Sequence, residues 1–235
     1  MLYFQKRDVR VKTLDSAKER YQAYLLRKQI FCDHLQWVPS KNERIETDIY
    51  DGHAILMGAL DQQDNVVGTV RIIPAGRPMM IEKNFVSLIA ASHRIKKEPN
   101  TIEISRLCVC QYMSTRKRLS IGNALYSAIY NWSILHKTRY LYMVVEQKML
   151  RNLNLKGYPC RQIGPLLTLP GGVMTVAALL DWREYDRMPQ STVPTGMHFK
   201  PGNMPHLRES GPGYSKQRSD FIFEPKPLPT AHTVR

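Results

Sequence analysis

Long apolar runs, a secretory leader and paired cysteines are all missing from this chain of 235 residues. No apolar stretch approaches the roughly 18 residues that a membrane-spanning helix needs. The N-terminus lacks the apolar stretch and small-residue cleavage site of a signal peptide. The four cysteines show no spacing typical of a disulfide framework. These absences argue against a membrane-spanning or disulfide-stabilised protein, and we expect a soluble, cytoplasmic one without a membrane span.

Signatures of metal, nucleotide and nucleic-acid binding are missing as well. Cys108-x-Cys110 has no second pair at metal-ligand spacing, so we expect small buried cysteines on a strand and no metal site. The seven histidines are scattered, and there is no Walker loop for phosphates. No zinc finger, aromatic RNA-binding strand or clear helix-turn-helix is present, which argues against a nucleic-acid partner.

Positive charge is what the sequence has in excess. It carries 34 Lys and Arg against 20 Asp and Glu, a formal net charge of +14. Such a chain favours an acidic partner, which can be nucleic acid, an anionic membrane surface, a phosphorylated ligand or an acidic protein. Hydrophobic residues make up 43% and charged residues 23%, which is ordinary for a folded domain and argues against disorder of the whole chain.

Composition divides the chain near residue 188. Residues 189–235 hold 8 of the 15 prolines and show no sustained hydrophobic period. This segment has six Lys and Arg against three acidic residues, so it contributes only +3 of the net charge. We predict one domain over residues 1–188 and a Pro-rich irregular extension over residues 189–235, with Phe221–Phe223 as its one apolar segment.

Hydrophobic periodicity predicts alternating helices and strands in the domain. We expect helices over residues 17–31 (with a Ser16/Glu19 capping box), 80–91, 121–136 and 148–156. We expect strands over residues 2–4, 54–60, 66–73, 101–110, 140–145, 158–163 and 173–180, and a polar loop over residues 41–52. This order predicts a single α/β domain in which helices flank a mixed, mostly antiparallel sheet. The layout resembles that of the GNAT acyltransferase superfamily.

The strands over residues 54–60 and 66–73 are separated by the polar residues 61–65 and are predicted to form a β-hairpin. An acidic trio, Glu46, Asp48 and Asp51, stands just before the first of these strands. Carboxylates so close repel one another unless cations or a ligand compensate them. One interpretation is a solvated acidic loop. The other is an ion-pair network with Arg27 and with Arg71, which lies inside an apolar strand and must be paired if it is buried.

Polar residues also interrupt the strand over residues 101–110. Glu103 and Ser105 share one face by the period of two, whereas Arg106 should face the other way unless a bulge turns it. Such a bulge would suit an active site, and a simple ion pair at the strand end is the alternative.

Three aromatic residues lie near these charges in the sequence, namely Phe31, Trp37 and Phe85. Each one alone is more often a core residue than a site residue. Aromatic rings beside carboxylates would suit a ligand that is both flat and cationic.

The segment from Arg118 to Ala124 contains Gly122, at the start of the helix predicted over residues 121–136. GNAT enzymes cradle the pyrophosphate of coenzyme A at such a turn, on the backbone N–H groups of a helix N-terminus. Here Leu119 stands where that pattern has Gln or Arg, so the match is degenerate.

Together these residues resemble the LuxI-type acyl-homoserine-lactone synthases, which make quorum-sensing autoinducers. The matching motifs are Leu26-Arg27-x-x-x-Phe31 with Gln36-Trp37, Glu46-x-Asp48-x-x-Asp51, Gly68-x-x-Arg71-x-x-Pro74 with Pro78 and Met80, Phe85, and Glu103-Ile104-Ser105-Arg106. The segments Lys156-Gly157-Tyr158 and Ile163-Gly164-Pro165 also fit. The resemblance spans about residues 1–185, and many spaced positions matching in order are more specific than any single motif.

The resemblance implies acylation of the amine of S-adenosylmethionine by an acyl thioester, followed by lactone closure that releases methylthioadenosine. S-adenosylmethionine is then a substrate, and no cofactor is expected. Glu103 is the expected base, with Ser105 and Arg106 beside it in the catalytic set. The expected S-adenosylmethionine pocket consists of Arg27, Phe31, Trp37, Glu46, Asp48, Asp51, Arg71 and Phe85. One of the three arginines should bind the methionyl carboxylate, and the sequence leaves open which one.

The acyl donor is expected to be an acyl-acyl carrier protein or acyl-CoA. The resemblance implies that Met143 and Val145 line an acyl tunnel. Members of the family that make 3-oxo products often carry Thr on this strand, so the absence of Thr or Ser from residues 142–147 favours an acyl chain unsubstituted at C3. A basic face for the acidic carrier is expected from Arg116, Lys117, Arg118, Lys148, Arg151 and Lys156.

Two other hypotheses stay open at this point. One is a GNAT-type acyl-CoA N-acyltransferase that acts on another amine, against which the degenerate phosphate turn and the acidic trio argue. The other is a basic nucleic-acid-binding protein, which leaves Arg71 and Glu103 unexplained.

Overall fold

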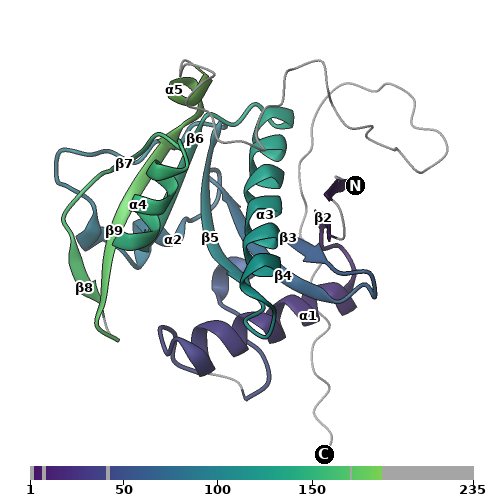
Figure 1. The fold of residues 1–235 in the computed structure, drawn as a ribbon. Coiled ribbons are helices and arrows are strands. Elements are labelled where there is room, and N and C mark those ends of the chain that lie inside the picture. Colours follow the sequence, from purple (N-terminus) through teal and green to yellow (C-terminus); the bar gives the residue numbers. More distant parts are fainter. Residues whose placement is uncertain (1–2, 7–8, 41–42, 170, 187–235) are drawn as a thin grey trace, which may run out of the picture.

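Nine strands form one mixed sheet in the computed structural model, which describes residues 3–6, 9–40, 43–169 and 171–186 (Figure 1). The strands are β1 (Tyr3–Lys6), β2 (Val9–Thr13), β3 (Ile55–Leu60), β4 (Val66–Pro74), β5 (Thr101–Val109), β6 (Tyr140–Glu146), β7 (Cys160–Gln162), β8 (Leu167–Leu169) and β9 (Val173–Asp181). Their order in the sheet is β1-β2-β3-β4-β5-β6-β9-β7, and β8 pairs with β9. The pair β5–β6 is parallel and the other described pairs are antiparallel, so the predicted mixed, mostly antiparallel sheet is confirmed.

Helices cover both faces of this sheet (Figure 1). They are α1 (Ala17–Arg27), α2 (Met80–Lys83), α3 (Thr115–Leu135), α4 (Gln147–Leu155) and α5 (Trp182–Asp186), with the π-helical turn η1 (Lys28–His34) and the 3₁₀ turns η2 (Ile49–Gly52) and η3 (Val86–Leu88). On β3, Met57 and Ala59 belong to the core beneath α3, whereas Leu56 and Leu60 belong to the core beneath α1. This alternation of side chains places α1 and α3 on opposite faces. No helix in the described ranges is long and apolar enough to cross a membrane.

The parallel pair β5–β6 separates in the middle of the sheet. Pairing runs from Thr101↔Tyr140 to Ile104↔Met143, although both strands continue beyond these residues. At the same level β5 bulges, because the register with β4 shifts and Arg106 has φ +53. A bulge bends its strand and interrupts pairing, so the sheet is open beyond Ile104.

Several predicted elements are confirmed and others are wrong. The hairpin, the strand over residues 101–110 and the Ser16/Glu19 capping box are present. The helix predicted over residues 80–91 is reduced to two short turns, α2 and η3, because Asn84 ends α2. Strands β2 and β8 were not predicted, since segments of five and three residues are too short to give a clear period. The extension over residues 189–235 lies outside the described residues.

The prediction that Gly122 forms a turn before a helix is wrong. Helix α3 begins at Thr115, where the side chain of Ser114 accepts a hydrogen bond from Lys117 N, so Gly122 lies two turns inside the helix. A single glycine is not specific for a turn, because glycine within a helix costs only about 1 kcal/mol relative to alanine. The N-terminus of this helix is therefore formed by residues 114–117 and not by the segment around Gly122.

Two other glycines have a structural reason. Gly157 follows the end of α4 with φ +83, the left-handed conformation that closes many helices. Gly164 lies against the backbone after η3, where a Cβ atom would stand 2.1 Å from Leu88 O and 2.6 Å from Ala90 N.

We predict that Gly164→Ala lowers the free energy of unfolding by about 1–3 kcal/mol, because the added methyl group must push two backbone segments apart. Gly122→Ala is the matched control, since nothing lies within 4 Å of its Cβ position. It should raise stability by up to about 1 kcal/mol, because alanine is the better helix residue. Urea denaturation of both variants measures these changes, and an undiminished stability of Gly164→Ala would contradict the prediction.

Candidate active site

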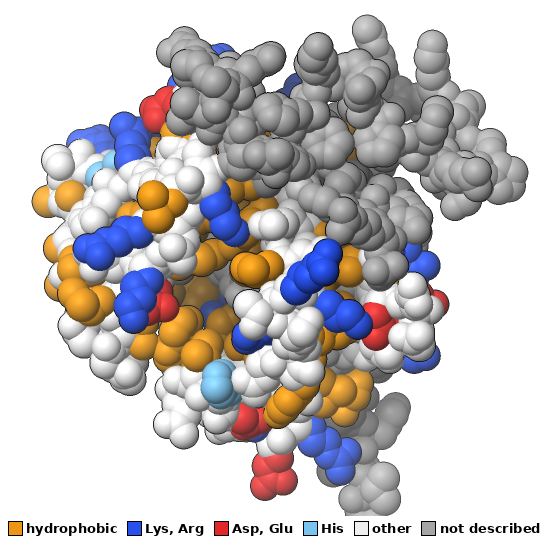
Figure 2. Space-filling view, in the orientation of Figure 1, with side chains coloured by type: hydrophobic (Ala, Val, Ile, Leu, Met, Phe, Trp, Pro, Cys, Tyr) orange, Lys and Arg blue, Asp and Glu red, His pale blue; other side chains and the backbone are white. Residues whose placement is uncertain are grey.

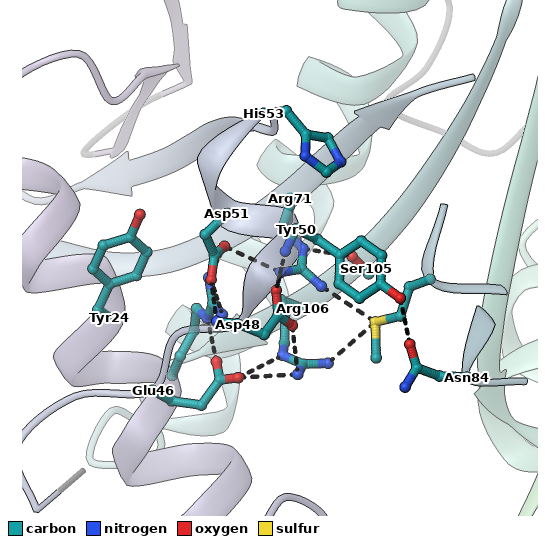
Figure 3. A network of polar contacts seen from close by, with 12 residues as sticks. Tyr24, Glu46, Asp48, Tyr50, Asp51, His53, Arg71, Asn84, Ser105 and Arg106 are labelled. Carbon is teal, nitrogen blue, oxygen red and sulfur yellow. Dashed lines mark hydrogen bonds and ion pairs between the residues drawn. The ribbon is translucent and has the colours of Figure 1, made fainter. Parts of the chain in front are cut away.

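Three arginines and three carboxylates form a closed ring of ion pairs beside the bulge of β5 (Figure 3). In order around the ring they are Arg27, Glu46, Arg106, Asp48, Arg71 and Asp51, and each bonds to its two neighbours. The charges alternate, so the ring is neutral as a whole. The interpretation of the acidic trio as an ion-pair network is confirmed, and the solvated loop is wrong.

Arg27 anchors the ring from the last turn of α1 and is fully buried. Its Nη1 and Nη2 atoms donate to the two carboxylate oxygens of Asp51 at 2.7 and 2.9 Å, and its Nε donates to Glu46. Burial alone would raise the pKa values of both carboxyl groups. The hydrogen bonds and charge of Arg27, together with Arg106 beside Glu46 and Arg71 beside Asp51, outweigh burial and hold both pKa values below their usual range.

Arg71 occupies the centre of β4 and is fully buried, so its predicted pairing is confirmed. Its Nε donates to Ser105 Oγ at 2.9 Å, and its Nη1 donates to Asp48 at 2.5 Å and to Asp51 at 3.1 Å. Asp48 also caps η2, because its side chain accepts from Tyr50 N at 2.9 Å. This cap fixes the acidic segment as a rigid turn.

Arg106 joins the ring because the bulge turns its side chain toward the acidic segment. Its Nη2 donates to Glu46 at 2.9 Å and to Asp48 at 3.1 Å. Its guanidinium also lies over the ring of Phe31, 5.6 Å from the ring centre. The bulge that the polar residues on this strand suggested is therefore present.

Glu103 lies outside the ring and is 1% exposed. Its two oxygens accept hydrogen bonds from Met80 N at 2.6 Å and from Ile81 N at 3.1 Å, at the start of α2. Burial raises the pKa of Glu103 to about 7, although these hydrogen bonds and the charge of Arg71 act in the opposite direction. A carboxyl group with such a pKa can take up and release a proton near neutral pH.

A cavity of about 950 Å³ opens where β5 and β6 separate. Figure 2 shows a hollow on the face of the molecule that is turned to the viewer, with hydrophobic side chains inside and Lys and Arg side chains around it. Of the residues predicted from the sequence, the cavity is lined by Phe31, Trp37, Phe85, Glu103, Ser105, Arg106, Met143 and Val145. The other ring members, Arg27, Glu46, Asp48, Asp51 and Arg71, are not lining residues and brace the wall behind Arg106.

The sequence missed several lining residues. Met80 places its Sδ atom 3.2 Å from Arg71 Nη2 and 3.8 Å from Arg106 Nη1. Met80 belongs to one of the matching family motifs, but no feature of the sequence was a reason to place it in the site. Tyr126, Met149 and Tyr158 line another part of the cavity. No local pattern distinguishes Tyr126 and Met149 from ordinary core residues, whereas Tyr158 belongs to the matching segment Lys156-Gly157-Tyr158.

The predicted basic residues lie at the ends of two neighbouring helices. Arg116, Lys117 and Arg118 are exposed in the first turn of α3, and Lys148 and Arg151 are exposed on α4. Lys156 is half-buried and links the two helices by donating to Asn123 Oδ1 at 3.2 Å. No cluster of three His, Cys, Asp or Glu residues suited to a metal ion occurs in the part of the chain that the structure describes.

Comparison with known proteins gives consistent results. The model of the autoinducer synthase family matches residues 11–187. A probable acyl-homoserine-lactone synthase of Sinorhizobium fredii is 29% identical over 160 residues, which are 66% of this chain and 76% of that protein.

The fold is also that of known synthases. The crystal structure of the acyl-homoserine-lactone synthase LasI has a TM-score of 0.66 at 20% identity, over 74% of this chain and 88% of that one. The CoA-dependent acyl-homoserine lactone synthase BjaI was solved with S-adenosylmethionine (SAM) and isopentyl-CoA. It has a TM-score of 0.62 at 23% identity, over 75% of this chain and 79% of that one. The expected GNAT-like fold is confirmed.

We predict that Asp51→Asn lowers the free energy of unfolding by about 3–5 kcal/mol, because it leaves two buried arginines short of one negative charge. The control Asp64→Asn removes the carboxylate of the exposed pair with Arg10 and should cost at most about 1 kcal/mol. Denaturation at neutral pH compares the two variants. Since the pKa of Asp51 is lowered in the folded state, the difference from wild type should shrink as the pH falls and Asp51 is protonated. Equal stabilities of both variants at neutral pH would contradict a role of the ring in folding.

Proposed function

Because the chain belongs to the autoinducer synthase family, and is thus an acyltransferase, we propose that it makes an N-acyl-L-homoserine lactone from SAM and an acyl thioester. The observation that carries this proposal is Glu103, a buried carboxyl group with a pKa of about 7 in a cavity large enough for two substrates. The thioester belongs to acyl carrier protein or to coenzyme A. The cytoplasm, where these substrates are made, is the proposed location.

Glu103 acts as the base of the first step. It removes a proton from the amine of SAM, directly or through one water, and the amine nitrogen attacks the thioester carbonyl. The C–N bond forms, the C–S bond breaks, and the carrier leaves as a thiol that takes up the proton. Backbone N–H groups that face the gap between β5 and β6 would hold the oxyanion.

The second step closes the lactone. A carboxylate oxygen of the methionyl group attacks the methionyl carbon that is bonded to the sulfonium sulfur. The bond between this carbon and the sulfur breaks, which releases methylthioadenosine. Phe31, Trp37 and Phe85 line the cavity and suit the flat, cationic part of SAM. Together with Ser105, which fixes Arg71, they hold the substrate in the geometry that this displacement needs.

We assign the methionyl carboxylate to Arg106, with Arg71 behind it. One nitrogen of each guanidinium approaches the sulfur of Met80, which is only a weak hydrogen-bond acceptor. A carboxylate near this sulfur would give Arg106, which lines the cavity, a strong acceptor, and the charge of Arg71 behind the wall would add to the attraction. Arg27 is committed to Glu46 and Asp51, and it does not line the cavity.

The basic residues on α3 and α4 support an acidic carrier as partner. Arg116, Lys117 and Arg118 stand at the N-terminus of α3, where the helix dipole favours negative charge. Positive side chains in that position are repelled by the helix dipole, and an acidic protein that docks there would stabilise them. Because Gly122 lies inside α3, the GNAT-type motif gives no separate support for coenzyme A, and acyl carrier protein is the donor that we propose first.

The direct test incubates the purified chain with SAM labelled in its methionyl group and with a panel of acyl chains on either carrier. We expect a labelled acyl-homoserine lactone and equimolar methylthioadenosine by mass spectrometry, with faster turnover on the protein carrier and an acyl chain unsubstituted at C3. If no labelled lactone forms with any donor, the proposed function is wrong.

The role of Glu103 predicts a specific pH dependence. A base must be deprotonated, so turnover should rise with pH through about 7, the pKa of Glu103. Glu103→Gln should lower kcat by about 10²–10⁴-fold and abolish this rise. Glu98→Gln, which changes an exposed carboxylate in the loop before β5, is the control and should keep the wild-type profile. Full activity of Glu103→Gln would show that another group is the base.

A further inference from the structure

The cavity lies on both faces of the sheet. Glu103 pairs with Tyr142, and both face the core beneath α2. Leu141 and Met143 alternate with Tyr142 and face the core beneath α3 and α4. All except Tyr142 line the cavity, so it has one compartment with Glu103 and a second compartment between the sheet and the helices α3 and α4.

The second compartment is apolar and crosses several strands. Its lining residues are Tyr126 and Ile129 of α3, Leu141 and Met143 of β6, Met149 and Leu153 of α4, Tyr158, Cys160 of β7 and Leu180 of β9. Leu141 pairs with Leu180, and Leu180 pairs with Cys160. Three strand spacings separate β5 from β7, a distance of about 14 Å. This distance suits a medium-chain acyl group.

Two of these lining residues are tyrosines whose rings are in contact, Tyr126 of α3 and Tyr158 just before β7. The rings of Tyr126 and Tyr158 lie 5.8 Å apart, and Tyr158 stacks on Tyr185 at 6.1 Å and meets the edge of Trp182 at 6.4 Å. Tyr158, Trp182 and Tyr185 are all buried, so the wall has a packed aromatic cluster behind it. Such a cluster cannot yield to a longer ligand without opening the core.

Tyr126 is the exchangeable part of this wall. Its ring spans from α3 to α4, because its hydroxyl donates to Met149 Sδ at 3.7 Å and Lys156 Nζ lies 5.2 Å from the ring centre. Both Tyr126 and Met149 line the compartment. A smaller side chain at position 126 would therefore add volume to the compartment, while Tyr158 keeps its contacts with Trp182 and Tyr185.

We propose that Tyr126 is the specificity-determining residue that sets the upper length of the acyl chain, by closing the compartment between α3 and α4. This proposal rests on the proposed function, because it takes the ligand of the second compartment to be the acyl group. Bulk of the ring sets the limit, whereas the hydroxyl only orients the ring.

The test measures kcat/KM of the full chain for a series of unbranched acyl donors that differ by two carbons. Tyr126→Leu should shift the preferred chain by about two carbons or more, with a gain of about tenfold in the ratio of the longer to the original donor. Tyr126→Phe keeps the ring and should keep the wild-type preference. Tyr130→Leu is the matched control, since Tyr130 lies one turn further along α3, packs on Trp182 and does not line the cavity.

An unchanged preference of Tyr126→Leu, or an equal shift in Tyr130→Leu, would overturn the proposal. If Tyr126→Leu does not fold by circular dichroism, Tyr126→Met replaces it and the same two outcomes apply. Failure of the proposed function is distinguishable, because the wild-type chain would then yield no lactone with any donor.

Discussion

The closed ring of three arginines and three carboxylates is the interaction on which the rest of this structure depends. A buried arginine is stable only when its charge is compensated and its N–H groups are bonded. Arg27 and Arg71 are completely buried, and they meet these conditions by sharing Asp51. Because the members come from α1, the η2 segment, β4 and β5, the ring connects parts of the chain that are far apart in sequence. It thereby fixes the wall against which a substrate would lie.

The separation of β5 from β6 is the second constraint, and the bulge at Arg106 connects it to the ring. The positive φ of Arg106 turns the side chain toward Glu46, and the same irregularity ends the pairing with β6. One change of backbone conformation therefore completes the ion pairs and opens the cavity. Glu103 lies just before this point, still within the paired part of β5, so its carboxyl group is held firmly at the edge of open space.

The sequence predicted the parts of the molecule that depend on local patterns. The hairpin, the helix cap at Ser16 and the pairing of Arg71 follow from periodicity, capping chemistry and the cost of burying a charge. Gly122 misled the prediction because one glycine can belong to a turn or to a helix, and flanking helix-forming residues decided between the two. Tyr126 could not be identified, and Tyr158 could be matched to a family segment but not given a role, since both depend on where α3 and α4 meet in space. The assignment of arginines to carboxylates likewise depends on tertiary geometry.

The closure of the ring also bears on how such a protein can change over generations. Each member bonds to two others, so the loss of one leaves two partners uncompensated, and viable substitutions there must come in concerted sets. Tyr126 is not bound by ion pairs in this way, because it contacts its neighbours mainly through the bulk of its ring. Single substitutions at position 126 can therefore be tolerated during evolution, whereas the members of the ion-pair ring must change together.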